Sequence, residues 1–417
     1  MTAARPPESE PSEALSAASQ PSGSRRPVVL QVLPELETGG VERSTVEITQ
    51  AIADAEGVAL VASAGGRMVG QVEHAGGRHI TLPLDTKNPL AIWRNAARLE
   101  AVIRQEQVAI VHARSRAPAW SAWLACRRTG VHFVTTHHGT YSETLPFKRR
   151  YNSVMARGEI VIAASHFIAE QIMAQHGVAA SRIRVIPRGV DPKRFDPDAV
   201  SADRLARLTR AWRLPDGATT VVLPGRLTAW KGHAVLIEAL ARLVGRDAGH
   251  AVPGREVPGR DIVAVLVGSD QGRHRYAAAL VRQAQALGVA DRLRLVGECD
   301  DMPAALKLSD VVVHASTQAE AFGRVVIEAQ AMARPVIAAD LGGPVETVEH
   351  EVTGLRVPPG DAAALAAAIE RVLALSPDAR LALGAAARAS VLRHYTVRAM
   401  QEATLDVYEA VLGRGGE

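Results

Sequence analysis

Short apolar runs alternate with longer amphipathic segments through the first half of the chain, starting at Val28. Runs without polar alternation are typical of strands buried on both faces of a parallel sheet. Helical periodicity between them completes a strand-helix-strand order, which favours a doubly wound α/β domain over residues 28–195. The predicted strands are 28–33, 58–63, 79–84, 108–113, 131–136, 159–165 and 183–187, and the clearest helices are 41–55, 89–105 and 165–176.

A second alternation of the same kind begins at Thr219 and runs to residue 395, with predicted strands at 219–225, 262–268, 292–297, 310–316, 334–340 and 353–359. The predicted fold class is therefore α/β, with two tandem Rossmann-like doubly wound domains that face each other across a cleft. Residues 196–218, rich in Pro and Asp, are predicted to link the domains. The Pro/Gly-rich stretch 247–261 is predicted to be a surface insertion. A terminal helix is predicted within 396–417, and packing back against the first domain is one arrangement open to it.

The amino-terminal segment and the cysteines bear on the cellular compartment. Residues 1–27 are rich in Pro, Ser, Ala and Glu and lack the apolar core of a signal peptide, so they are predicted to be a disordered tail. No run approaches the ~18 apolar residues of a membrane-spanning helix. Cys126 and Cys299 show the spacing of neither a disulfide framework nor a zinc site. We expect a cytoplasmic protein that would meet the cytoplasmic membrane only peripherally, at its inner face.

Positive charge is concentrated in the first predicted domain. Residues 28–195 carry 20 Lys and Arg against 14 Asp and Glu, whereas residues 196–417 carry 25 against 27. Two basic groups are FKRRY, with Lys148, Arg149 and Arg150, and ARSR, with Arg114 and Arg116. Such groups attract an anionic acceptor or an anionic membrane surface, or they form an ordinary solvated helix face. No aromatic residues interleave with them for base stacking, so a nucleic-acid partner is not expected.

The loops that follow the strands are where chemistry is expected, because ligands of open α/β sheets bind beyond the carboxyl ends of the strands. After the first strand, Gly39 and Gly40 permit close backbone approach before a predicted helix. The dinucleotide fingerprint G-x-G-x-x-G is absent there, which argues against a nicotinamide cofactor. After the first strand of the second domain, Arg226 and Lys231 are suited to neutralise a diphosphate. Gly232 follows Lys231 where a P-loop has Ser or Thr.

The stretch EAFGRVVIE brackets a predicted helix start with Glu320 and Glu328. Gly323 is predicted to begin this helix, whose free N–H groups would face a phosphate. Glu328 lies about one and a half turns further, where its carboxylate can accept hydrogen bonds from a vicinal diol such as a ribose. Glu320, on the preceding loop, can accept from hydroxyls attached beyond the diphosphate. Taken alone, the two acids are equally compatible with a solvated loop acid and a helix-surface acid.

Together these motifs resemble the family-4 retaining glycosyltransferases of the GT-B fold. The resemblance rests on GGVERS, TTHHG, VIPRGVD, GRLTAWKG, EAFGRVVIE with its E-x7-E spacing, and GGPVETVEHEVTGLRVPPGD, and it covers residues 28 to about 395. It implies transfer of a sugar from a nucleoside-diphosphate-sugar to an acceptor hydroxyl, with retention of the anomeric configuration. It also implies that Arg226 and Lys231 bind the donor diphosphate and stabilise the leaving nucleotide, and that Glu328 holds the ribose.

The resemblance implies roles for four further candidates. Glu320 would contact the donor sugar near its reacting carbon. Phe322 and Gly323 would offer backbone contacts to the donor. Gly40 would approach the phosphate or the sugar from the other domain.

The strand end TTHHG offers two histidines to the same cleft. The resemblance favours His138 as the residue that contacts the transferred sugar, with His137 as the alternative. One residue departs from the family pattern, since relatives usually carry Asn in the turn P-N-G-V-D, where this chain has Arg188. Arg188 lies near the predicted domain hinge, where it either contacts the acceptor or points to solvent. The resemblance also implies that neither a metal nor a cofactor is needed besides the nucleotide-sugar co-substrate. The D-x-D of Asp196 and Asp198 lies in the linker around a proline and is not expected to bind a metal.

No carboxylate is clearly placed as a nucleophile, so the family expectation is front-face substitution, in which the leaving phosphate helps to deprotonate the acceptor. The basic first domain is compatible with a lipid-linked or lipopolysaccharide-type acceptor in cell-envelope synthesis. Two other classes stay open: a nucleotide-sugar-binding protein without transferase activity, and a nucleotide-sugar epimerase or phosphorylase on a similar fold. The intact set of Glu320, Lys231 and Arg226 argues against the first. An epimerase would need no acceptor, and a phosphorylase would depend on inorganic phosphate.

Overall fold

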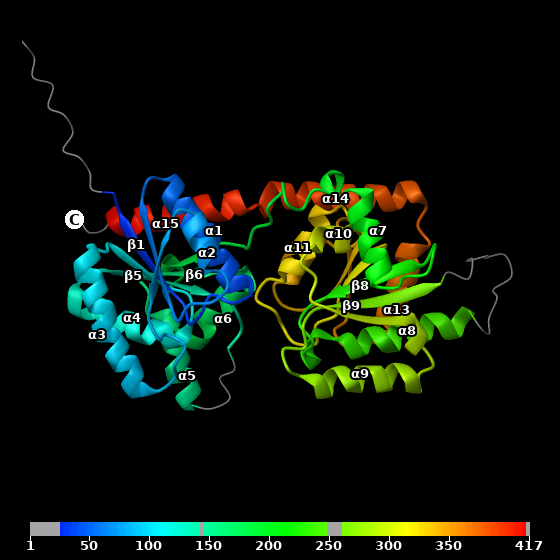
Figure 1. The fold of residues 1–417 in the computed structure, drawn as a ribbon, viewed down its shortest axis with the longest axis horizontal. Helices are drawn as coiled ribbons and strands as arrows, with labels where there is room; N and C mark the ends of the chain where they lie inside the picture. Colours follow the sequence, from blue (N-terminus) through cyan, green and yellow to red (C-terminus); the bar gives the residue numbers. More distant parts are fainter. Residues whose placement is uncertain (1–25, 142–145, 248–260, 414–417) are drawn as a thin grey trace, which may run out of the picture.

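The computed structural model describes residues 26–141, 146–247 and 261–413, which form two lobes lying side by side (Figure 1). Almost all of the expected tail (1–27) and insertion (247–261) lies outside the described residues. Each lobe is built on one parallel sheet with helices on both faces. The predicted fold class, two tandem Rossmann-like domains, is confirmed.

The first sheet has the strand order β3-β2-β1-β4-β5-β6-β7, and all neighbouring strands pair in parallel. The chain winds outwards through β2 and β3, returns past β1 to β4, and thereby creates a switch point between β1 and β4. Its strands are β1 (Val28–Val32), β2 (Val58–Ser63), β3 (Arg78–Thr81), β4 (Ile110–Ala113), β5 (His132–His137), β6 (Ile160–Ala163) and β7 (Ile183–Val185). Its helices are α1 (Gly40–Asp54), α2 (Val69–His74), α3 (Pro89–Glu106), α4 (Arg116–Thr129), α5 (Pro146–Asn152) and α6 (His166–His176).

The second sheet repeats the design with the order β10-β9-β8-β11-β12-β13, again all parallel, and its switch point lies between β8 and β11. Its strands are β8 (Thr219–Pro224), β9 (Ile262–Val267), β10 (Leu293–Gly297), β11 (Val311–His314), β12 (Val336–Ala339) and β13 (Leu355–Val357). Its helices are α8 (His233–Asp247), α9 (His274–Ala286), α10 (Met302–Lys307), α11 (Arg324–Ala331), α12 (Pro344–Thr347), α13 (Ala362–Leu373) and α14 (Pro377–His394).

The predicted linker contributes helix α7 (Ala202–Ala211), which packs against α10 of the second lobe. Arg204 on α7 pairs with Asp301 at 2.6 Å, and Trp212 is buried against strands β8 and β9. Residues 202–212 are therefore part of the second lobe's helical layer and not a free connection. Asp196 accepts a hydrogen bond from the backbone N–H of Asp198 and pairs with Arg388, so its carboxylate has a structural role.

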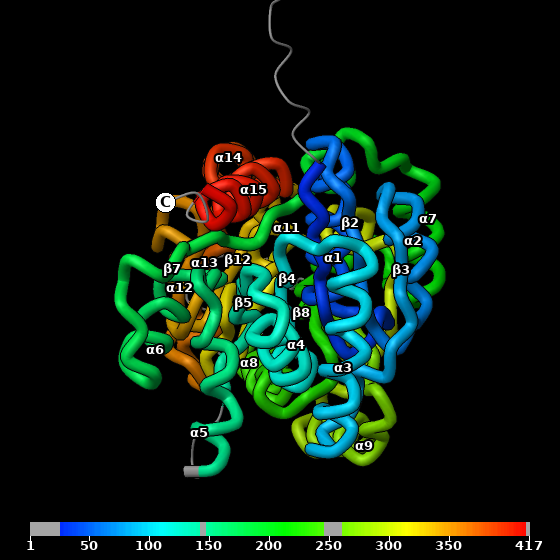
Figure 2. The backbone as a smooth tube through the Cα atoms, turned by 90° about the vertical axis from the view of Figure 1, so that its left-hand side faces the viewer, coloured from blue at the N-terminus to red at the C-terminus, as the bar shows by residue number. Residues whose placement is uncertain are grey.

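The terminal helix α15 (Val397–Gly413) crosses back to the first lobe, where it lies beside α1 (Figures 1 and 2). Met400, Val407, Tyr408 and Val411 are buried against the first sheet, on the face that α1 also covers. The Tyr408 hydroxyl also hydrogen-bonds His112 Nδ1 at 2.7 Å. The chain therefore crosses twice between the lobes, once before α7 and once after α14. These two connections restrict how the lobes can move relative to each other.

The lobes share a buried interface near α6 and α11. The hydroxyl of Ser165, the N-cap of α6, donates to the carbonyl of Ala321 at 2.6 Å. Glu346 of the second lobe accepts hydrogen bonds from the backbone N–H groups of His166 and Phe167, in the first turn of α6. An acid from one lobe therefore caps a helix of the other. Among the described residues, no helix combines the length and apolar composition that crossing a membrane requires.

Candidate active site

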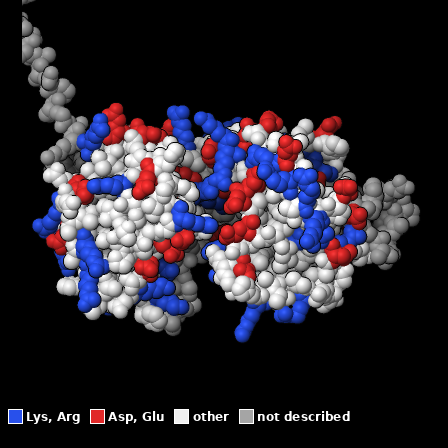
Figure 3. Space-filling view, viewed as in Figure 1, with Lys and Arg blue, Asp and Glu red and all other residues white. Residues whose placement is uncertain are grey.

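The loops that follow the switch-point strands of both sheets meet at the junction of the lobes, where Figure 3 shows side chains of both charges gathered. Gly40 follows β1 and begins α1; a Cβ at Gly40 would lie 3.6 Å from Cδ of Arg324, which begins α11 in the other lobe. Arg226 follows β8, is exposed, and is close enough to Glu42 of α1 to lower that residue's pKa. Burial outweighs Arg226 and leaves the pKa of Glu42 raised.

Glu320 is held by groups from two loops and one strand end. Its Oε1 accepts hydrogen bonds from Lys231 Nζ at 2.6 Å, from His314 Nε2 at 2.7 Å and from the Ser316 hydroxyl. The side chains of Glu320 and Lys231 are only 13% and 14% exposed. Burial alone would raise the pKa of Glu320, but His314 and then Lys231 hold it well below its usual range. Glu320 therefore remains an ionised carboxylate with a fixed orientation throughout the neutral pH range.

Gly232 is the reason that Lys231 can reach Glu320. It adopts a left-handed conformation with φ of 76°, and a Cβ there would lie 1.8 Å from the carbonyl oxygen of Ala315. Only glycine permits this contact between the loop after β8 and the segment after β11. Lys231 also lies over the Trp230 ring, with Nζ 4.7 Å from its centroid. The ammonium group is thus fixed by a carboxylate and a ring, as a preorganised cation for phosphate requires.

Helix α11 begins at Arg324, one residue later than predicted, because Gly323 is its N-cap with φ of 79°. A Cβ at Gly323 would lie 2.7 Å from Cγ of Pro344, so this turn also requires glycine. Phe322 is buried, and its ring packs edge-on against Tyr395 with centroids 5.7 Å apart. Only the backbone of Phe322 is therefore available to a ligand, and the first-turn N–H groups of α11 have no acceptor within the helix.

Glu328 belongs to an ion chain that crosses the lobes. Arg324 Nη2 lies 3.1 Å from Oε1 of Glu47 on α1, and Arg324 Nε lies 3.6 Å from Oε1 of Glu328. Burial raises the pKa of Glu328, and Arg324 opposes this shift. The structure leaves Glu47 Oε2 and Arg324 Nη1 buried without hydrogen-bond partners in the described part of the chain. Glu328 is thus a largely buried acid and not a helix-surface one.

The two histidines after β5 have different surroundings. His138 Nδ1 lies 2.6 Å from Nη2 of Arg188. The ring of His137 lies beside those of Tyr141 and His176, and burial lowers its pKa to about 3. Arg188 is 6% exposed, so the expectation that it points to solvent is wrong.

Arg114 is also buried and not part of a solvated helix face. Its Nη1 donates to Gln31 Oε1 at 2.7 Å and its Nη2 to Ser44 Oγ at 2.5 Å, while Arg188 Nη1 donates to the same hydroxyl at 3.1 Å. Burial lowers the pKa of Arg114 to about 10 and that of Arg188 to about 9. Two buried guanidinium groups on one hydroxyl are unusual, because like charges in a low-dielectric site repel each other.

The side chains of four residues of this site were not singled out from the sequence: His314, Ser316, Arg324 and Glu47. His314 ends a buried strand at the carboxyl edge of the sheet, a position that by itself signals a functional side chain. Arg324 lies within the E-x7-E stretch, next to Gly323. Glu47 carries no local signal, because its partner is 277 residues away along the chain.

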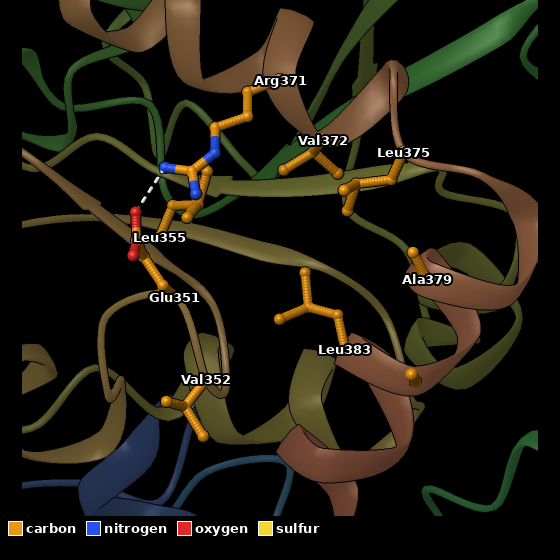
Figure 4. Close-up of a pocket in the computed structure, with 9 residues that line it drawn as sticks. Glu351, Val352, Leu355, Arg371, Val372, Leu375, Ala379 and Leu383 are labelled. Atoms are coloured by element: carbon orange, nitrogen blue, oxygen red, sulfur yellow. Dashed lines mark hydrogen bonds and ion pairs between the residues drawn. The ribbon is translucent and has the colours of Figure 1, made fainter.

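A hollow elsewhere on the second lobe has a different character. It lies between α13 and α14, at the amino end of β13, and is lined mainly by aliphatic side chains such as Val372, Leu375 and Leu383 beside the Glu351–Arg371 pair (Figure 4). The opposite end of the sheet carries the charged loops, so this hollow is not the candidate active site. No group of three or more His, Cys, Asp or Glu residues that could hold a metal occurs within the described ranges.

Comparison with known proteins identifies the family of the chain. The family described as Glycosyltransferase Family 4 matches residues 38–194, and the family described as Glycosyl transferases group 1 matches residues 207–390. A D-inositol 3-phosphate glycosyltransferase from Saccharomonospora viridis is 30% identical over 337 residues, which span 77% of this chain and 74% of that protein.

Solved structures agree with these matches. A glycosyltransferase from Rickettsia africae ESF-5 superimposes with a TM-score of 0.83 and 33% identity, over 93% of this chain and 99% of that one. Anabaena Alr3699/HepE, solved in complex with UDP-glucose, shares the fold with a TM-score of 0.77 and 24% identity, over 92% and 99% of the two chains. The chain thus belongs to the family-4 glycosyltransferases of the GT-B fold, and its activity is glycosyl transfer.

Proposed function

We propose that this protein is a retaining glycosyltransferase that moves a sugar from a nucleoside-diphosphate-sugar to a hydroxyl of an anionic acceptor. The observation that carries the proposal is the fixed Lys231–Glu320 pair beside Arg226 and the α11 N-terminus, opposite Gly40 of the other lobe. One group of residues suits each part of a nucleotide-sugar: cations and helix N–H groups for the diphosphate, and carboxylates for hydroxyls. The binding of UDP-glucose by HepE supports this class of donor.

The donor would lie across the first turn of α11. Arg226, Lys231 and the N–H groups after Gly323 would stabilise the charge that grows on the leaving diphosphate. Because these cations already supply positive charge, the reaction would need neither a metal nor a cofactor. Glu328 would accept hydrogen bonds from the ribose, Glu320 from hydroxyls of the sugar, and the backbone of Phe322 and Gly40 would border the donor.

Retention is proposed from the family resemblance, and Glu320 is poorly suited to act as the nucleophile of a double displacement. Oε1 of Glu320 already accepts from three side chains, and a carboxylate with a strongly lowered pKa is a weak nucleophile. The acceptor hydroxyl would therefore attack from the face that the diphosphate leaves, with a diphosphate oxygen taking its proton. His138 would contact the transferred sugar, and contact between the lobes would exclude water.

The acceptor is proposed to carry phosphate or another anionic group. Arg114, Arg116 and Arg188 follow β4 and β7 on the first lobe, which would be the acceptor side of the junction. The nearby carboxylate, Glu47, already forms an ion pair with Arg324. A negative charge on the acceptor would compensate this excess of buried cations. The relatives named as D-inositol 3-phosphate glycosyltransferases favour a phosphorylated polyol, and lipid-linked or lipopolysaccharide-type acceptors of cell-envelope synthesis carry the same group.

A lipid-linked acceptor would bring the first lobe to an anionic membrane. Helices α3, α4 and α5 lie on the side of this lobe away from α15 (Figures 1 and 2). Arg157, a few residues after α5, stacks on Trp123 of α4 at 4.2 Å, and Arg127 lies 5.1 Å from the same ring. Arg128 lies 5.9 Å from the ring of Trp93 on α3, which is 56% exposed. Aromatic rings beside arginines are suited to the interface of an anionic bilayer.

Two measurements test the reaction. Wild-type protein would be incubated with UDP-, GDP- and ADP-sugars, and nucleotide release would be followed with and without EDTA. We expect release with one class of donor, unchanged by EDTA. The anomeric configuration of the product, read by NMR, must equal that of the donor. An inverted product would refute retention, and loss of activity with EDTA would refute the role assigned to the cations.

Two comparisons test the acceptor and the membrane contact. Transfer to inositol phosphate should exceed transfer to unphosphorylated inositol about 100-fold, because charge-assisted hydrogen bonds to phosphate are lost in the latter. Protein should float with vesicles that contain anionic phospholipid, and should float less when Arg127 and Arg157 are both replaced by Glu. Equal transfer to both polyols would contradict an anionic acceptor. Protein that stays in the soluble fraction at low salt would contradict the membrane contact.

A further inference from the structure

The hydrogen bond between Arg188 and His138 fixes which nitrogen of the imidazole carries the proton. Nη2 of Arg188 lies 2.6 Å from Nδ1 of His138. A guanidinium group has only donors, so Nδ1 must be the acceptor and cannot carry a proton. In a neutral imidazole the single proton then resides on Nε2.

The surroundings of His138 keep the ring neutral. Burial, followed by the charge of Arg188, holds the pKa of His138 well below its usual range. Arg114, His112 and His137 act in the same direction. Nε2 of His138 is buried and has no hydrogen-bond acceptor among the residues that the structure describes. A buried N–H donor without a partner is costly, which favours a ligand oxygen at this position.

Arg188 is itself held firmly enough to impose this arrangement. It is 6% exposed, and its Nη1 donates to Ser44 Oγ at 3.1 Å. Ser44 lies on α1, about one turn from Gly40, so the guanidinium is fixed between the first helix and the strand end that carries His138. Two residues after His138, the Thr140 hydroxyl donates to the carbonyl of Ala319 at 3.4 Å, next to Glu320. His138 thus belongs to the segment that faces the Glu320 loop.

We propose that Arg188 is a positioning residue that locks His138 as the Nε2–H tautomer, so that His138 donates a hydrogen bond to an oxygen of the bound donor. This inference rests on the proposed function for the identity of that oxygen. It assigns a role to the one residue that departs from the Asn of the family turn. His138 cannot accept the acceptor's proton, because Nδ1 is occupied and Nε2 is already protonated. Deprotonation is left to the diphosphate.

Two substitutions of Arg188 with opposite polarity test the lock. Arg188→Lys keeps a cationic donor at this position, whereas Arg188→Glu offers an acceptor, which would draw the proton to Nδ1. Protein labelled with 15N-histidine would be examined by long-range 1H–15N correlation at about pH 8, above the ordinary pKa of histidine. The signals of His138 would be assigned by their loss in His138→Gln, and those of His137 serve as an internal reference.

We expect the Nε2–H tautomer in the wild type and in Arg188→Lys, and protonated Nδ1 in Arg188→Glu. A role limited to packing would give the same tautomer in both variants. An Nδ1–H tautomer or an imidazolium in the wild type would overturn the proposal. This readout needs no substrate, so it holds even if no nucleotide-sugar proves to be a donor, an outcome that would instead remove the proposed function.

Kinetics with the donor found in the panel provide the second readout. Arg188→Glu should lower kcat by about 100-fold while KM for the donor changes by less than about threefold, and Arg188→Lys should keep most of the activity. Arg184→Leu is the matched control, since Arg184 is an exposed arginine on β7 whose guanidinium donates to the nearby carbonyls of Ser181 and Ile183. An equal loss of kcat in the Lys and Glu variants would contradict the role of Arg188 as a hydrogen-bond donor to His138. Thermal unfolding of each variant would show whether it is folded.

Discussion

Replacing Lys231 with Met separates the chemical role of the Lys231–Glu320 pair from its structural role. Nζ and Oε1 lie 2.6 Å apart in side chains that are 14% and 13% exposed. Two unit charges at this distance attract by about 6 kcal/mol at an effective dielectric constant of ~20, and desolvation of both groups offsets much of this energy. Removing one partner of a buried pair costs about 3–5 kcal/mol. Because His314 and Ser316 still bind Glu320, we expect about 2–3 kcal/mol for Lys231→Met.

The double variant Lys231→Met/Glu320→Gln carries no unpaired charge. It should therefore be at least as stable as either single variant, which corresponds to a coupling free energy of about 2 kcal/mol. Turnover should not follow stability in this way, since the diphosphate loses Lys231 and the sugar loses the carboxylate of Glu320. We expect turnover to fall about 100-fold or more in both single variants and to stay low in the double variant. Recovery of stability without recovery of activity would mark the pair as part of the reaction.

Urea unfolding followed by circular dichroism measures the stability, and nucleotide release in the presence of acceptor measures the turnover. Arg204→Met is the control, because Arg204 also pairs with an acid at 2.6 Å but is 30% exposed and lies outside the site. It should cost about 1 kcal/mol or less and leave turnover unchanged. Near-normal turnover in Lys231→Met would refute the site assignment. A double variant that regains turnover would show that the pair serves stability alone.

Three further predictions concern single side chains. Burial raises the pKa of Glu328 above its ordinary value, so its ionised form opposes folding at neutral pH. Glu328→Gln should add about 1 kcal/mol of stability there, a gain lost below about pH 4, where the wild-type acid is protonated in both states. Calorimetric titration should show about tenfold weaker nucleotide binding by the same variant, and unchanged binding would remove the ribose contact. Tyr408→Phe leaves the buried His112 Nδ1 unpaired and should cost about 1–2 kcal/mol in thermal unfolding, with turnover intact. Glu346→Ala removes the acceptor of two α6 amides and should cost about 1 kcal/mol in urea unfolding, whereas a wild-type midpoint would show that this cap is not needed.

The two sheets could be predicted from the sequence because parallel strands covered on both faces are largely apolar and lack regular polar alternation. β8, for example, is buried at all of its positions, and the predicted run 219–225 ends one residue beyond it. The loops after such strands could be named for the same reason, so Arg226, Lys231 and Glu320 were located without knowledge of their contacts. Their roles in binding stay predictions. Local patterns thus fixed which edge of each sheet carries the site.

The contacts between distant residues could not be predicted, because they depend on how the lobes pack. Arg324 and its partner Glu47 are 277 residues apart along the chain, and His112 and its partner Tyr408 are 296 residues apart. The group ARSR was expected either to attract an anionic partner or to form a solvated helix face, yet Arg114 is buried while Arg116 lies over the Tyr141 ring at 4.2 Å. Charge counted along a sequence does not show whether a cation faces solvent or the interior.

The burial of Arg114 and Arg188 gives the first-lobe side of the site an electrostatic character of its own. A buried cation is usually compensated by a nearby carboxylate. Here the nearby carboxylate, Glu47, is already paired with Arg324. The burial of both guanidinium groups lowers their pKa values, to about 10 and about 9, which shows that the charged forms are disfavoured by their surroundings. An anion bound between the lobes would relieve this penalty, whereas a neutral acceptor would leave it in place. The same arginine that would attract the acceptor also fixes the proton of His138, so acceptor selection and donor contact would depend on one guanidinium group.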